Sequence, residues 1–119
     1  AAQGIDKRFA DQPAAAAAVH EAVADAWEGW GDYDEAMRHS RRALDWWAML
    51  EMPMPTARAR RLQKLCGQAR MAQQLESAEN ACESAVAIER TLPAGVSVGL
   101  LVEQAKLRFE QGRCAEMLE

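Results

Sequence analysis

Residues that favour β-strands are scarce in this sequence. Only ten of its 119 residues are Val, Ile or Thr, the branched side chains that pack well in strands. Ala, Glu, Gln, Arg, Leu and Met are abundant instead, and all six favour helices. We therefore expect an all-α fold in a single domain.

Long apolar runs are absent as well. The longest covers residues 14–19, whereas a helix that crosses a bilayer needs roughly 20 apolar residues. We therefore expect no membrane span, and the sequence has no signal-peptide pattern. The chain begins with Ala1 rather than Met and ends on Glu119 in a helical pattern, so we expect it to be a piece of a longer polypeptide.

Cysteine is present at only three positions, Cys66, Cys82 and Cys114, without a C-x-x-C spacing. This odd number fits neither a disulfide framework nor a zinc site. We expect Cys66 and Cys82 to be buried thiols, because a free cysteine behaves as a small apolar residue. A Cys66–Cys82 disulfide is the less favoured alternative, since the expected compartment is the reducing cytoplasm.

Basic residues are outnumbered by acidic ones, 14 against 18, which gives a formal net charge of −4 and a sequence pI near 5.2. Nucleic acids and anionic lipids select basic surfaces. We therefore expect neither of them as a partner of this chain. A protein or peptide is the expected partner.

Catalytic motifs are absent from the sequence. His20-Glu21 is not followed by a second histidine at the spacing of the helical zinc-hydrolase motif. A glycine-rich phosphate loop and a G-x-S-x-G elbow are also missing. We expect His20 and His39 to be packed or solvated residues, and we expect no enzymatic activity, no metal site and no cofactor.

Glycine and proline divide the chain into helices. Pro13 suits a first helical turn, and Gly31 suits the residue after a helix end. Asp32 and Glu35 form an acidic version of the capping box, and Thr56 and Ser97 are candidate caps. The predicted helices span residues 13–30, 32–51, 56–72, 75–91 and 97–112. Residues 1–12 are predicted to be the tail of a preceding helix, and residues 113–119 the start of another.

The unit of helix, tight turn, helix and loop recurs along the chain. Residues 27–36 contain, in order, a large aromatic, a turn glycine, a second aromatic and a small Ala. This pattern resembles the tetratricopeptide repeat. The resemblance implies a right-handed α-solenoid, a superhelix of stacked antiparallel helical hairpins, over residues 13–119. Its repeats would lie at about residues 14–52, 56–92 and 97–119, the last one truncated.

The first helix of each repeat has an apolar stripe at helical spacing, which we expect to face the core. In the first repeat the stripe contains Val19, Val23, Ala26, Trp27 and Trp30. In the second repeat it contains Leu62, Leu65, Cys66 and Ala69. In the third repeat it contains Val98, Leu101, Val102, Ala105 and Phe109.

The opposite sides of these helices are polar. In tetratricopeptide-like proteins this side lines a concave groove, so the resemblance implies a groove for a peptide or a partner helix. The candidate groove residues are Glu21, Asp25 and Glu28, then Arg60, Lys64 and Met71, and finally Glu103 and Lys106.

Between residues 52 and 75 the chain has five bases and no acid, namely Arg58, Arg60, Arg61, Lys64 and Arg70. One interpretation is a site for an acidic or carboxylate-bearing partner. The other is that these bases pair with the acids of the first repeat or remain solvated, because charge runs usually lie on the surface.

Two functions follow as hypotheses. The first is a protein–protein interaction module of a larger, bacterial-looking protein. The second is a regulatory or sensor segment, similar in style to the repeats that follow a DNA-binding or kinase domain in bacterial regulators. Exposed apolar ends of a solenoid also favour self-association of the chain.

Overall fold

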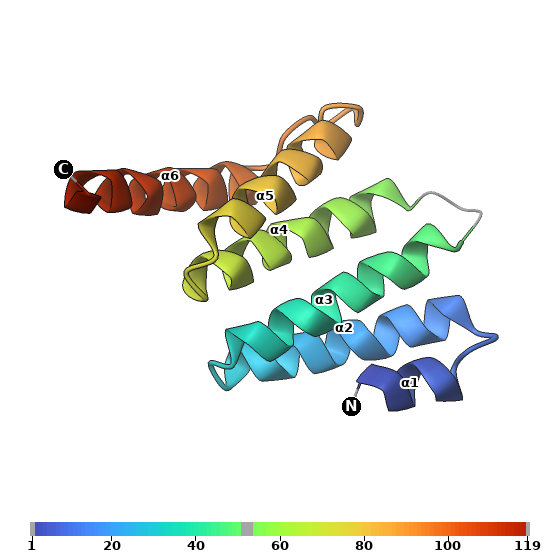
Figure 1. Cartoon of the computed structure of the whole chain (residues 1–119). Helices are drawn as coiled ribbons and strands as arrows, with labels where there is room; N and C mark the ends of the chain where they lie inside the picture. The colour runs from blue at the N-terminus through green and yellow to red at the C-terminus, as the bar shows by residue number, and fades with distance from the viewer. Residues whose placement is uncertain (1, 51–53, 119) are drawn as a thin grey trace.

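A computed structural model describes residues 2–50 and 54–118, and every regular element within them is an α-helix. The predicted all-α class is confirmed. The helices, labelled in Figure 1, are α1 (Ala2–Arg8), α2 (Pro13–Gly29), α3 (Tyr33–Ala48), α4 (Pro55–Met71), α5 (Leu75–Glu89) and α6 (Val98–Leu118). In this part of the chain no helix is long and apolar enough to cross a membrane.

The helices pack mainly as two hairpins. Helix α2 packs along α3 and α4 along α5, while α3 meets α4 between the hairpins. Helix α6 crosses α5 and α4, and α1 lies on α2. The molecule measures 51 × 35 × 19 Å, and α1 and α6 lie at its opposite ends (Figure 1).

The two hairpin turns have the same backbone geometry. Gly31 and Gln73 occupy equivalent positions, and both have a left-handed backbone, with φ of 81° and 62°. In each turn the next residue donates a backbone hydrogen bond to the preceding helix, from Asp32 to Trp27 and from Gln74 to Ala69. The repeated sequence pattern therefore corresponds to a repeated local structure.

Two of the predicted helix caps are confirmed. The Asp32 carboxylate accepts a hydrogen bond from the Glu35 backbone N–H at 3.2 Å, and the Ser97 hydroxyl accepts one from the Leu100 N–H at 3.3 Å. The prediction that Thr56 caps α4 is wrong, because the helix begins at Pro55, whose fixed φ suits the first helical position.

Two predicted helix ends differ from those of the structure or lie outside its described residues. Gly112 does not end α6, which continues to Leu118, so no separate helix starts at residue 113. A glycine inside a helix lowers the stability of the helix only modestly. The helical turns on both sides of Gly112 compensate for this loss. Helix α3 ends at Ala48, and the predicted end at residue 51 lies outside the described residues.

Small residues bring α4 and α5 close together. Cys66 and Ala69 of α4, with Ala78 and Cys82 of α5, are all buried at this crossing. Cys66 and Cys82 form a disulfide, with their Cα atoms 5.4 Å apart. The prediction of two free thiols is wrong, because the helix crossing brings together two residues whose sequence spacing matched no cysteine motif.

The apolar stripe of α4 faces the core as predicted, with Leu65, Cys66 and Ala69 buried. The predictions for α2 and α6 are wrong. Helix α2 buries a face of small residues and one histidine, while its predicted stripe is half-buried or exposed; the buried residues are Ala16, Ala17, His20 and Ala24. These small side chains let α2 approach α3 more closely than the bulky stripe would allow.

Helix α6 is likewise turned away from the predicted orientation. It buries Leu100 and Leu107, and leaves its broad apolar stripe exposed. Two glycines at the α4–α6 contact explain this orientation. A Cβ at Gly99 would lie 2.8 Å from the Gln63 side chain, and one at Gly67 would lie 3.2 Å from the Glu103 carboxylate. Because Gly67 and Gly99 have no side chain, the polar face of α6 can pack closely against α4.

The disulfide generates the first testable prediction. Closing a loop of 16 residues restricts the unfolded chain, so reducing the Cys66–Cys82 bond should lower the free energy of unfolding by about 3 kcal/mol. Urea unfolding with and without a thiol reductant measures this change. The double variant Cys66→Ala/Cys82→Ala is the control, and its stability should not respond to the reductant. An equal response from both proteins would contradict the disulfide.

Candidate functional site

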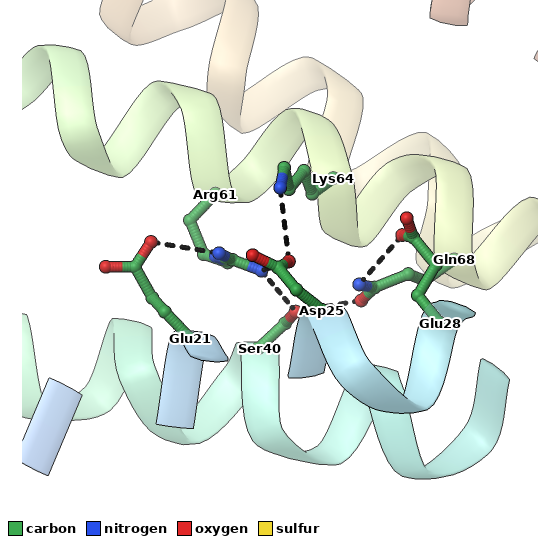
Figure 2. A network of polar contacts seen from close by, with 7 residues as sticks. All are labelled: Glu21, Asp25, Glu28, Ser40, Arg61, Lys64 and Gln68. Carbon is green, nitrogen blue, oxygen red and sulfur yellow. Dashed lines mark hydrogen bonds and ion pairs between the residues drawn. The ribbon is translucent and has the colours of Figure 1, made fainter. Parts of the chain in front are cut away.

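A network of charged and polar side chains joins α2, α3 and α4 (Figure 2). Its centre is Arg61, which is only 3% exposed. The guanidinium Nη2 donates to Glu21 Oε2 at 2.9 Å, and Nη1 donates to Asp25 Oδ1 at 3.1 Å. The Arg61 network, as we call it, consists of Glu21, Asp25, Glu28, Ser40, Arg61, Lys64 and Gln68.

Asp25 binds a second cation in the same network. Lys64 Nζ lies 3.1 Å from Asp25 Oδ1, and both side chains are partly exposed. Burial raises the pKa of Asp25, but hydrogen bonds from Arg61 and Lys64 outweigh this effect and hold the pKa below its usual value. Asp25 is therefore ionised at neutral pH and neutralises part of the positive charge of the basic segment, residues 58–70.

A chain of neutral groups extends the network across three helices. The Ser40 hydroxyl of α3 donates to Gln68 Oε1 of α4 at 2.8 Å, and Gln68 Nε2 donates to Glu28 Oε1 of α2 at 3.1 Å. Ser40 and Gln68 are buried. Because buried polar groups need partners, this chain fixes the position of α2 relative to α4.

The polar surface continues onto α6. Arg70 of α4 forms an ion pair with Glu103 of α6 at 3.5 Å, and Lys106 lies 3.9 Å from the other carboxylate oxygen of Glu103. Glu103 packs against Gly67. The charged groups of α4 therefore contact those of α2 through Arg61 and Lys64, and those of α6 through Arg70.

The eight predicted groove residues fall into two groups. Six make ion pairs or hydrogen bonds between or within α2, α4 and α6, namely Glu21, Asp25, Glu28, Lys64, Glu103 and Lys106. Arg60 and Met71 are exposed. Within the described residues, Arg60 makes no hydrogen bond or ion pair. The interpretation in which the bases pair with neighbouring acids therefore accounts for Arg61 and Lys64.

A second polar cluster was not predicted. His20 of α2 is fully buried, and its Nε2 lies 2.8 Å from Asp6 Oδ1 of α1. Its Nδ1 lies 2.9 Å from Nδ1 of the buried His39 of α3. Trp46 Nε1 donates to Asp6 at 2.7 Å, and Arg42 forms an ion pair with Asp6 at 2.9 Å. Of the two expected states of the histidines, packed or solvated, the structure shows the packed one, but their partner on α1 gave no sequence signal.

The protonation of this cluster follows from its hydrogen bonds. Burial raises the pKa of Asp6, but hydrogen bonds from His20 and Trp46 and the charge of Arg42 hold it below its usual value. Burial and the neighbouring His20 lower the pKa of His39. The Nδ1···Nδ1 contact requires that only one of the two rings carries a proton there. The described residues contain no group of side chains arranged to hold a metal ion.

An apolar groove lies beside this cluster, with a volume of about 460 Å³. We call it the α1/α2 groove, and its lining residues are Ile5, Ala22, Val23, Ala26, Trp27, Trp30, Glu35 and His39. Trp27 and Trp30 meet edge to face, with ring centroids 5.3 Å apart. Trp30 is 76% exposed. Large exposed aromatic side chains are typical of binding surfaces.

Comparisons with known proteins add no assignment. No protein-family model matches this sequence, and neither the curated proteins nor the solved structures contain a match to it.

The Arg61 network generates a prediction for stability. Replacing Arg61 by Met keeps an apolar stem but leaves the Glu21 and Asp25 carboxylates without their buried partner. We expect the free energy of unfolding to fall by about 2 kcal/mol in urea titrations. Arg60→Met, one residue away but exposed, is the matched control and should change stability by no more than about 0.5 kcal/mol. Equal losses for the two variants would contradict a special role of Arg61.

The histidine cluster predicts a pH dependence. The groups that act on the pKa of His39 are His20 of α2 and Glu35 and Arg38 of α3, while Asp6 of α1 contacts His20 on its other ring nitrogen. The pKa of His39 is lowered by folding, so the unfolded chain binds the proton more tightly. The free energy of unfolding is therefore highest above the ordinary pKa of 6.5, and it decreases as the pH falls below that value.

Urea unfolding between about pH 7.5 and pH 5 tests this dependence. His39→Gln should lose much of the fall in stability over this range. The lowered pKa of Asp6 acts only below its ordinary value of 3.8, outside this window. A wild-type chain that becomes more stable on acidification would refute the prediction.

Proposed function

We propose that the chain is a non-catalytic protein-binding module that holds a helix or peptide along the surface of α2, α4 and α6. One observation supports this most directly. Polar and charged side chains of α4 contact those of α2 and, at other positions, those of α6, so the three alternate helices are bridged by polar contacts. This arrangement agrees with the tetratricopeptide-like solenoid that the repeat pattern implies.

The network prepares this surface for binding. Side chains that are hydrogen-bonded to Arg61 and Gln68 are already restricted in conformation. Less conformational entropy is therefore lost when a partner binds them. Arg61 and Lys64 are neutralised by acids of α2, which leaves the exposed Arg60 for a partner. Met71 is exposed and offers a flexible apolar contact. The partner that fits is an amphipathic helix with an acidic residue beside its apolar stripe.

Fluorescence anisotropy with a labelled helical peptide of this composition tests the proposal. Arg60→Glu should weaken binding about fivefold, or about 1 kcal/mol, because it replaces an attraction by a repulsion at an exposed position. Arg90→Glu is the control, since it changes the net charge equally at the exposed C-terminal end of α5. Absence of binding, or equal weakening by both variants, would refute the proposed surface.

A regulatory or sensor segment is the second candidate function. The contacts of His20 with Asp6 and His39 favour it, because these side chains link α1 to both helices of the first hairpin and burial lowers the pKa of His39. In this function α1 would respond to conditions and pass the change to an attached effector domain. The proposed origin is a bacterial signalling or transcription regulator.

The disulfide bears on the compartment. The cytoplasmic expectation depended on reading the cysteines as free thiols. A buried disulfide persists in oxidising compartments and is rare in the cytoplasm, so we propose an oxidising location for this part of the protein. Stability with and without reductant, measured as above, tests the disulfide on which this proposal depends.

A further inference from the structure

We propose that copies of this chain bind one another head to tail, with α6 of one copy seated in the α1/α2 groove of the next. The contact uses neither Arg60 nor the Arg61 network. It therefore stands or falls separately from the proposed function.

The exposed side of α6 is the apolar side. The α6 stripe, defined as Val98, Leu101, Val102, Ala105 and Phe109, lies at helical spacing along this side. Val98 is 76%, Leu101 52% and Phe109 66% exposed. Among residues 98–113, the large apolar residues that the opposite side buries are Leu100 and Leu107. A helix that turns its broader apolar stripe to solvent has a surface suited to a partner.

The α1/α2 groove has the shape for a helix. Its residues on α2 follow helical spacing from Ala22 to Trp30, a length of roughly 12 Å. Ala22 and Ala26 are small, which allows the axis of a second helix to come close. Helix α1 already packs on the first half of the same α2 face, and its Ile5 lines the groove. A helix seated in the groove would continue this existing packing.

The charges select α6 as the occupant. Arg108 and Arg113 flank the α6 stripe. Glu35 is the charged residue among those that line the groove; its Oε1 pairs with the exposed Arg38 of the same helix, while its Oε2 makes no hydrogen bond or ion pair within the described residues. Burial and the neighbouring His20 lower the pKa of His39, which also lines the groove. Bases beside the stripe can therefore meet the second oxygen of the Glu35 carboxylate, which favours this pairing. Pairing of α6 with α6 of a second copy would place bases against bases.

The position of the two surfaces fixes the type of assembly. Helix α1, whose Ile5 lines the groove, and α6, which carries the stripe, lie at opposite ends of the molecule (Figure 1). A contact between two different surfaces is heterologous, so each bound copy still offers one free groove and one free stripe. The assembly grows with concentration instead of stopping at a dimer.

Sedimentation velocity of the 119-residue chain over a wide concentration range tests the proposal. The wild type should form dimers and then longer oligomers. Leu101→Glu in the stripe and Ala26→Glu in the groove are both at exposed positions. Each variant alone should remain monomeric at concentrations at least tenfold above those at which the wild type associates. Circular dichroism checks that both remain folded.

Mixing the two variants gives the decisive measurement. The Leu101→Glu chain keeps an intact groove and the Ala26→Glu chain keeps an intact stripe, so the mixture should form a 1:1 dimer that does not grow. Ala87→Glu, at an exposed position on α5, is the control and should associate like the wild type. A monomeric wild type, a mixture that stays monomeric, or Ala26→Glu chains that still associate through α6 would each overturn the proposal.

Discussion

The close approach of helices at small residues is the constraint on which this structure depends. Cys66 and Ala69 let α4 meet α5, and glycines let α6 lie on α4. The close approach of α4 to α5 also allows Cys66 and Cys82 to form a disulfide, which links the two helices of the second hairpin covalently. Close approach at small residues also decides which face of α6 is buried, because only small residues permit a short distance between helix axes. The apolar stripe that remains outside is a direct result of this choice.

Charged residues have a structural as well as a functional role here. Arg61 is buried among acids of a neighbouring helix, where it stabilises the relative position of two hairpins. Removing Arg61 is expected to cost more than removing the exposed Arg60, because Glu21 and Asp25 then lose an ion-pair partner held in the protein interior. The basic segment is therefore divided between a structural residue, Arg61, and an exposed neighbour, Arg60, that remains available to a partner. Adjacent positions on one helix thus serve different purposes.

Two separate surfaces can work together in one molecule. We propose the polar surface of α2, α4 and α6 as the site of a partner helix, and the α1/α2 groove with the α6 stripe as the contact between copies of the chain. Head-to-tail assembly would align polar surfaces from successive copies and raise the effective concentration of binding sites. The histidine cluster lies beside the groove, with His39 in its wall. Protonation of the cluster would therefore act at the place where copies meet.

The sequence by itself determined the helical class, the main helix positions, two caps and the equivalence of the two tight turns, because these features depend on local spacing and backbone preferences. It also predicted the polar residues that gather on α2, α4 and α6. Only the tertiary structure decided the pairing of Cys66 with Cys82, the contact of Asp6 with His20, and the outward orientation of the α2 and α6 stripes. Helical periodicity shows which residues share a face. It does not show which face is buried, because that depends on how closely a neighbouring helix can approach.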